Sequence, residues 1–285
     1  LTLRVELMNK LSNHVFVPIG IVLVALFAVW LWFVPKGYFG ITSAVGYTFC
    51  HQDPARSPHA FGHTLALCYR CMGLFIGIFI GALWQLGERR HAKFNSASIL
   101  TFAFPALFFY AFDGLNASFL PKLLSVEPLY QDQSWIRMLS GLLLGNAVAL
   151  LVIPLFNRVF YQDFVHAAPV QGILRKTGIA VFDALLLFVF LREMDVGMVL
   201  ANTAAILTAI GIVTLLYSIL STVILKQNNQ FHTLREGWQV FLLGGLITMM
   251  QIGGITWLRY AVTGTWGWPF TGTGAPDLFF DSIGF

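Results

Sequence analysis

The sequence predicts an all-α integral membrane protein, a polytopic helical bundle of about seven transmembrane helices. Of its 285 residues, 57% are hydrophobic and 11% are charged, and the mean hydropathy is +0.75. Soluble domains carry roughly 25% charged residues, so this composition excludes an ordinary soluble protein. Inside a bilayer every backbone polar group needs an internal partner, which favours helices of about 20 apolar residues.

Seven apolar stretches are long enough to span a bilayer. They run over residues 15–34, 67–87, 94–112, 138–157, 172–191, 196–225 and 237–258. We expect the first to be a retained anchor rather than a cleaved signal. The fifth contains Asp183, an ionisable residue within an apolar segment. Such residues are functional candidates by default, and two roles stay open for Asp183, an ion pair with a basic residue or proton transfer.

Basic residues predict the orientation of the chain in the membrane. Ten Lys and Arg residues fall on the side of the amino terminus, against seven on the other side. Cytoplasmic loops carry the excess of Lys and Arg, so we expect a cytoplasmic N-terminus and an outer C-terminus in the cell inner membrane. The net charge of +4 is scattered between the spans, which indicates topology signals and no nucleic-acid partner.

Residues 50–71, CHQDPARSPHAFGHTLALCYRC, hold all three cysteines and three of the seven histidines. Cys68 and Cys71 form a C-x-x-C pair at the entrance of a predicted helix, where backbone N–H groups lower a thiol pKa. A third Cys and a His complete a tetrahedral Cys₃His set of the kind that binds zinc. The predicted metal ligands are Cys50, His51, Cys68 and Cys71, with His59 and His63 as substitutes if His51 points away.

Three other interpretations of the cysteines stay open. The metal could be catalytic, or the cysteines could be redox active, with Cys68 and Cys71 cycling between dithiol and disulfide and a bilayer quinone taking the electrons. Cys50 would then be a relay or resolving thiol. The third is inert packing or a simple clamp. Because closed all-protein ligand sets tend to be structural, structural zinc is the leading interpretation.

Charged residues and glycines near the span ends complete the candidate site. Asp113 and Arg137 suit an ion pair at the membrane rim or an anion site. Arginine binds carboxylates and phosphates through a planar fork of donors, and the candidates for an anion or structural site are Arg56, Arg70, Asp113 and Arg137. Small residues four apart let helices approach closely, and the predicted packing glycines are Gly73, Gly77, Gly81, Gly141 and Gly145.

Several of these motifs together resemble an uncharacterised prokaryotic membrane protein family, domain of unknown function 2085. They are CHQDPARS from Cys50, LCYRCMGLFIG from Leu67, DGLN from Asp113 and RMLSGLLLG from Arg137. The resemblance covers about residues 45–146. It implies a site made of Cys50, His51, Gln52, Pro54, Arg56, Ser57, Cys68, Arg70, Cys71, Asp113 and Arg137, with His59 and His63 outside the pattern, and it implies no activity.

The chain is therefore divided into residues 1–165, a four-span core with the cysteine segment, and residues 166–285, a three-span extension with an aromatic tail. We expect an accessory or scaffold subunit, surrounded by lipid and by other membrane protein subunits, with an outer-facing zinc site. The alternative is a membrane enzyme, either a quinone-coupled thiol oxidoreductase or a zinc-dependent hydrolase of an anionic lipid-linked substrate.

Overall fold

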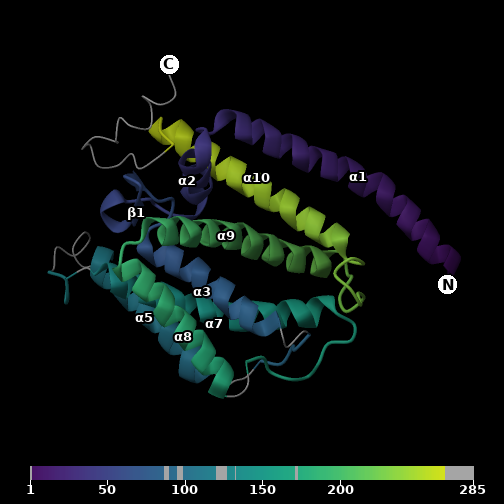
Figure 1. Ribbon diagram of the computed structural model, residues 1–285. Helices are drawn as coiled ribbons and strands as arrows, with labels where there is room; N and C mark the ends of the chain where they lie inside the picture. The colour runs from purple at the N-terminus through teal and green to yellow at the C-terminus, as the bar shows by residue number, and fades with distance from the viewer. Residues whose placement is uncertain are drawn as a thin grey trace.

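The protein is a bundle of long helices, described by a computed structural model for residues 2–86, 90–94, 99–119, 127–131, 133–170 and 173–266 (Figure 1). The helices are α1 (Thr2–Phe33), α2 (Gly37–Phe49), α3 (Tyr69–Gln85), α5 (Phe104–Gly114), α7 (Ser134–Phe160), α8 (Ile173–Leu191), α9 (Asp195–Ile224) and α10 (Trp238–Thr263). Shorter elements are a 3₁₀ turn η1 (Pro54–Arg56), an antiparallel pair of strands β1 (His59–Ala60) and β2 (His63–Thr64), and the π-helical turns η3 (Ile99–Ala103) and η4 (Leu115–Phe119). The predicted all-α class is confirmed.

Four described helical segments are long and apolar enough to cross a membrane. They are Ile99–Ala117, Ser134–Phe160, Asp195–Ile224 and Trp238–Thr263. Val17–Phe33 and Gly37–Phe49 pass the same test together, but the chain bends by 115° between them. The described part of the chain thus supports four or five spans, so the predicted count of seven is not established. The polytopic membrane bundle itself fits the structure.

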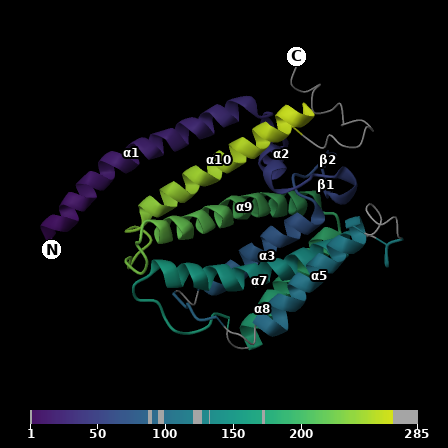
Figure 2. The same ribbon diagram turned by 180° about the vertical axis from the view of Figure 1, so that it is seen from behind.

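Helix α3 lies at the centre of the bundle (Figures 1 and 2). It packs against α7, α8 and α9, while α10 covers α9 and α1 covers α10. Helix α5 packs on α7. Two of the helices beyond residue 165, α8 and α9, therefore contact α3 directly, and the division at residue 165 stays a prediction. The aromatic tail lies outside the described residues from position 267 onward.

The contact between α3 and α7 is made backbone to backbone. A Cβ atom on Gly77 would overlap the carbonyl oxygen of Leu142, and one on Gly145 would overlap that of Leu74. Gly73 and Gly141 make the same kind of contact, whereas a Cβ atom on Gly81 would meet the Cβ of Ala149. Glycine is required at these positions because any side chain would push the two helices apart.

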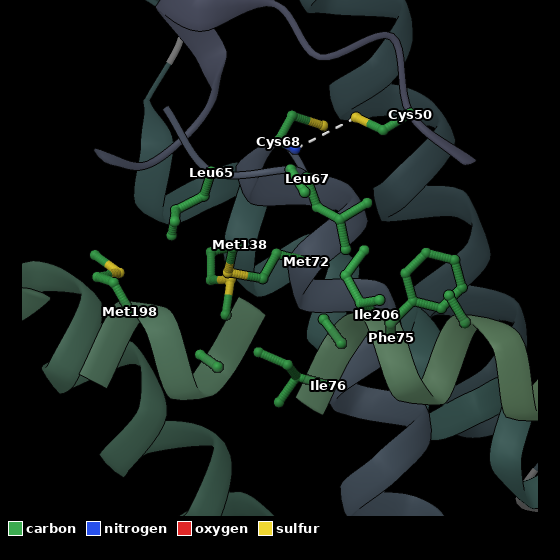
Figure 3. Close-up of a cluster of buried hydrophobic side chains, with 14 of the residues drawn as sticks. Cys50, Leu65, Leu67, Cys68, Met72, Phe75, Ile76, Met138, Met198 and Ile206 are labelled. Carbon is green, nitrogen blue, oxygen red and sulfur yellow. Dashed lines mark hydrogen bonds between the residues drawn. The ribbon is translucent and has the colours of Figure 1, made fainter. Parts of the chain in front are cut away.

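The main hydrophobic core is built around the same two helices (Figure 3). Met72 from α3 and Met138 from α7 are completely buried, and α9 adds Met198 and Ile206. Cys50 and Cys68 belong to this cluster, together with Leu65 and Leu67 of the segment before α3. The cysteine segment is thus packed onto the core of the bundle.

Helix α2 and the two-stranded hairpin lie between the first two predicted spans. Helix α2 has 13 residues, too few to span a bilayer, and for that reason hydropathy does not reveal it. It lies with β1 at the end of the bundle where α10 ends, opposite the start of α1 (Figure 1). The candidate site is formed at this end.

Candidate metal centre

The three cysteine side chains converge from two segments of the chain. Cys50 follows the last residue of α2, and Cys68 is the residue before α3, whose first turn carries Cys71. Their three Sγ atoms all lie within 4.8 Å of one another, and none forms a disulfide. Thiolates bound to one zinc ion at about 2.3 Å are roughly 3.8 Å apart in a tetrahedral site. The three sulfurs therefore fit a single thiophilic ion.

Backbone N–H groups surround the sulfur of Cys50. The N–H of Cys68 donates to Cys50 Sγ at 3.3 Å, and the N–H of Gln52 donates to it at 3.4 Å (Figure 3). Gln52 adopts a left-handed φ of 59°, which turns the chain back around the sulfur. Donors aimed at a sulfur favour its charged form, so this turn is suited to a thiolate ligand.

The close sulfurs also perturb one another. The hydrogen bond with Cys50, followed by that with Cys71, holds the pKa of Cys68 well below its usual value. The hydrogen bond with Cys68 raises the pKa of Cys50 to about 12. These opposite shifts mean that Cys68 loses its proton more readily than Cys50 does. A bound divalent ion would neutralise the thiolates and displace the remaining protons.

His51 is adjacent to the cluster but is not one of its three converging members. Its Nδ1 atom lies 3.9 Å from Cys50 Sγ. Desolvation lowers the pKa of His51, and the charges of Arg56 and Arg137 lower it further, although Cys68 and Asp53 oppose them. A lowered pKa favours the neutral imidazole, which is the form that binds metals.

The two substitute histidines have other contacts in the hairpin. His59 Nε2 lies 3.1 Å from Thr64 Oγ1 across the two strands. The ring of His63 stacks on Phe39 of α2, with the ring centroids 4.3 Å apart. Neither belongs to the group of converging sulfurs.

Gln52 and Gly46 fix α2 against the segment that leads into Cys68. The buried amide of Gln52 donates from Nε2 to the carbonyl oxygens of Ser43 at 2.7 Å and Ala66 at 3.1 Å. A Cβ atom on Gly46 would overlap the same Ala66 carbonyl. The two ends of the cysteine segment are therefore held together by the protein itself.

An ion pair joins the C-x-x-C turn to α5. Arg70 donates from Nε to Asp113 Oδ2 at 3.0 Å, and Tyr130 donates to Asp113 Oδ1 at 2.7 Å. Arg70 of α3 is thus an ion-pair partner of Asp113, and the expected pairing of Asp113 with Arg137 stays a prediction. Arg137 is buried, and Arg56 donates to the Ala117 carbonyl at 3.1 Å.

Arg259 of α10 is a site residue that sequence reasoning missed. Its Nη1 donates to the carbonyl oxygen of Cys50 at 2.8 Å and to that of Tyr47. Its guanidinium lies 3.6 Å from the centroid of the Tyr47 ring. The sequence signal was a single arginine at the end of an apolar stretch, which is indistinguishable from a topology charge.

Part of the chain is similar to known proteins, and this part includes the cysteines. Residues 50–151 match the family of predicted membrane proteins of domain of unknown function 2085, abbreviated DUF2085. The predicted resemblance is therefore confirmed. An uncharacterised protein of Methanocaldococcus jannaschii, MJ1492, is 27% identical over 115 residues, which cover 40% of this chain and 68% of that protein. No solved structure gives a significant match.

The DUF2085 segment contains the three cysteines, Arg70 and Asp113 but ends before α8. Arg259 lies outside it, although it contacts Cys50. The family description gives a membrane location and no activity, so the function has to be inferred from the site.

Proposed function

We propose that this protein is a membrane accessory or scaffold protein whose Cys50, Cys68 and Cys71 bind a structural zinc ion. The convergence of three sulfurs within 4.8 Å is the observation that carries the proposal. His51 is the proposed fourth ligand because its Nδ1 is already next to Cys50 Sγ. When bound, zinc would supply a cross-link and neutralise the thiolates.

A structural role is favoured by the surroundings of the sulfurs. Cys50 and Cys68 are 5% and 3% exposed and belong to the hydrophobic core. Closed ligand sets made only of protein atoms are typical of structural zinc, whereas catalytic sites keep an open position. The ion would hold the segment between α2 and α3 against the end of the bundle.

The scaffold role is proposed because the segment between α2 and α3 exposes an aromatic side chain. The turn between β1 and β2 carries Phe61, which is 59% exposed. An aromatic side chain on a short, rigid hairpin is suited to contact with another protein, because aromatic anchors dominate interface energies. We propose that other membrane protein subunits bind at this end, on the outer side of the cell inner membrane.

The proposal is tested by elemental analysis of the purified protein, with thiols counted under denaturing conditions with and without a chelator. We expect about one zinc ion per chain, with all three thiols titrating once zinc is chelated. Cys68→Ser and Cys71→Ser should lose the zinc and lower Tm by more than about 5 °C, because ligand binding energy is folding energy. His63→Ala is the control and should keep the zinc.

Two outcomes would contradict the zinc proposal. Metal-free protein with a single titratable thiol means that two cysteines form a disulfide, and the quinone-coupled thiol oxidoreductase becomes the function to test. Zinc that survives with full occupancy in both serine variants would place the ion elsewhere in the chain.

A further inference from the structure

A groove runs along α7 between η3 and α8, and none of the three cysteines lines it. Its volume is about 400 Å³, and it is lined mainly by apolar side chains. The floor is formed by α7 from Leu139 to Leu151, a length of about 18 Å at the helical rise per residue. Its volume is in the range of small-molecule sites, and its length suits an extended hydrocarbon chain.

The groove also contains a buried polar pair. Asp183 of α8 is 8% exposed and Asn146 of α7 is 1% exposed, and both line the groove. Asn146 Nδ2 donates to Asp183 Oδ2 at 2.8 Å. The second oxygen of each side chain, Oδ1 in both cases, accepts no hydrogen bond from any described residue.

Among the described residues, Asp183 lacks the ion pair with a basic residue that the sequence left open. No basic side chain of the described residues pairs with it, and its one hydrogen bond comes from a neutral amide. Lys176 lines the groove two turns earlier on α8, where its side chain is exposed. A buried polar group without its partner costs about 1–3 kcal/mol, and a charged one costs more.

The groove opens to the outside of the helix bundle beside α8. Ala180 and Ala184 line it and are exposed, so small side chains leave a gap where α8 faces outward. The opposite side of the groove is lined by Ile99, Thr101, Phe102 and Ala103 of η3, which also packs on α7. A molecule dissolved in the bilayer can therefore enter sideways, without crossing the core of the bundle.

We propose that this groove binds an apolar molecule with a hydrogen-bond-donating head, an amine or an alcohol, whose head reaches Asp183. The apolar walls hold the chain of the molecule. The two unpaired oxygens require a donor, which excludes a plain hydrocarbon as the preferred ligand. The zinc site plays no part in this binding, so the two proposals stand or fall separately.

The test uses the purified full-length protein in maltoside micelles with three probes of equal length, dodecylamine, dodecanol and dodecane. The bound probe is quantified by mass spectrometry after subtraction of the amount held by empty micelles. We expect saturable binding of dodecylamine or dodecanol at least about tenfold tighter than that of dodecane, the effect of one hydrogen bond to a charged acceptor. The stronger of the two identifies the donor.

Two groove variants and two matched controls locate the site. Asp183→Leu should remove the preference for a donor, and Leu143→Trp should abolish binding because the indole fills the groove. Leu185→Trp, on an exposed position of the same helix α8, and Asp195→Asn should bind as the unaltered protein does. If Asp183→Leu does not fold, Asp183→Asn replaces it and should reduce dodecylamine binding about tenfold.

Equal binding of the three probes to the unaltered protein would overturn the proposal, because it would remove the role of the polar pair. Unchanged binding in Leu143→Trp would overturn it as well, since the probe would then be bound at another place.

Discussion

The guanidinium of Arg259 in α10 donates hydrogen bonds to two carbonyl oxygens at the cysteine turn. These carbonyls are at the end of α2, where a helix has unpaired acceptors and a partial negative charge. The stacking on Tyr47 fixes the plane of the guanidinium. Arg259 is therefore a positioning residue for Cys50.

We predict that Arg259→Gln weakens zinc binding about 10- to 100-fold, the usual effect of removing a group that orients a metal ligand. Arg259→Lys should have a zinc affinity between those of the unaltered protein and Arg259→Gln, because lysine keeps the charge but loses the planar fork. Competition with a chromogenic chelator measures both. Arg192→Gln is the control, because Arg192 follows α8 and lies over the ring of Phe188 instead of contacting the cysteine turn. Equal affinities for Arg259→Gln and the unaltered protein would show that Arg259 has no positioning role.

The predicted metal ligands lie close together along the chain, whereas the site residues that were missed lie far from the residues they contact. The cysteines are recognisable because C-x-x-C spacing is local and rare. Arg259 is 209 positions from Cys50, and no local pattern reports such a contact. The ion pair of Arg70 with Asp113 was not predicted for a similar reason, because 43 positions separate the two residues.

The α3–α7 pair is the element on which both candidate sites depend. Helix α3 carries Cys71 and α7 forms the floor of the groove. Their closeness results from glycines that allow one backbone to lie against the other. Dispersion contacts, and not the hydrophobic effect, hold helices together in lipid, so small losses of fit are costly there.

We predict that Gly77→Leu lowers the free energy of unfolding by about 1–3 kcal/mol or more, the range for overpacking. Gly211→Leu is the matched control on α9, since a Cβ atom at Gly211 would meet nothing within 4 Å. Thermal unfolding in detergent compares the two variants. A similar change of Tm in both would mean that helix propensity, and not the close contact, determines the result.

At the scale of elements, hydropathy located the long apolar helices but not the boundaries that tertiary contacts set. Residues 138–157 were expected in a helix, and α7 covers Ser134–Phe160. Helix α2 was missed because its 13 residues are too few to span a bilayer. The chain bends by 115° before it, at a break next to Pro35. Its position depends on Gln52 and Gly46 contacting Ala66, and neither contact has a periodic signal in the sequence.

The whole molecule has two chemically different ends. The cysteines, the hairpin and Arg259 gather at one end, and the turn between α9 and α10 lies at the other (Figure 2). The excess of basic residues on the amino-terminal side predicts that the cysteine end faces outward. Orientation is a property of the chain in its membrane, so the fold alone does not determine it.

Single exposed cysteines at the two ends test the predicted orientation. We expect a membrane-impermeant maleimide to modify His59→Cys in intact cells and to modify Gln230→Cys only after the membrane is opened. Both positions are exposed, and the unaltered chain corrects for its three native thiols. The reverse labelling pattern would place the cysteine cluster in the cytoplasm.

The contact between Arg259 and Cys50 also sets an order of events during synthesis. Ribosomes add about 5–20 residues per second, so the 209 positions that separate the two residues correspond to about 10–40 s. During that interval Cys50 has been synthesised but Arg259 has not. The proposed zinc ion would therefore be able to bind before Arg259 contacts the carbonyl oxygen of Cys50, and synthesis of α10 would end that interval.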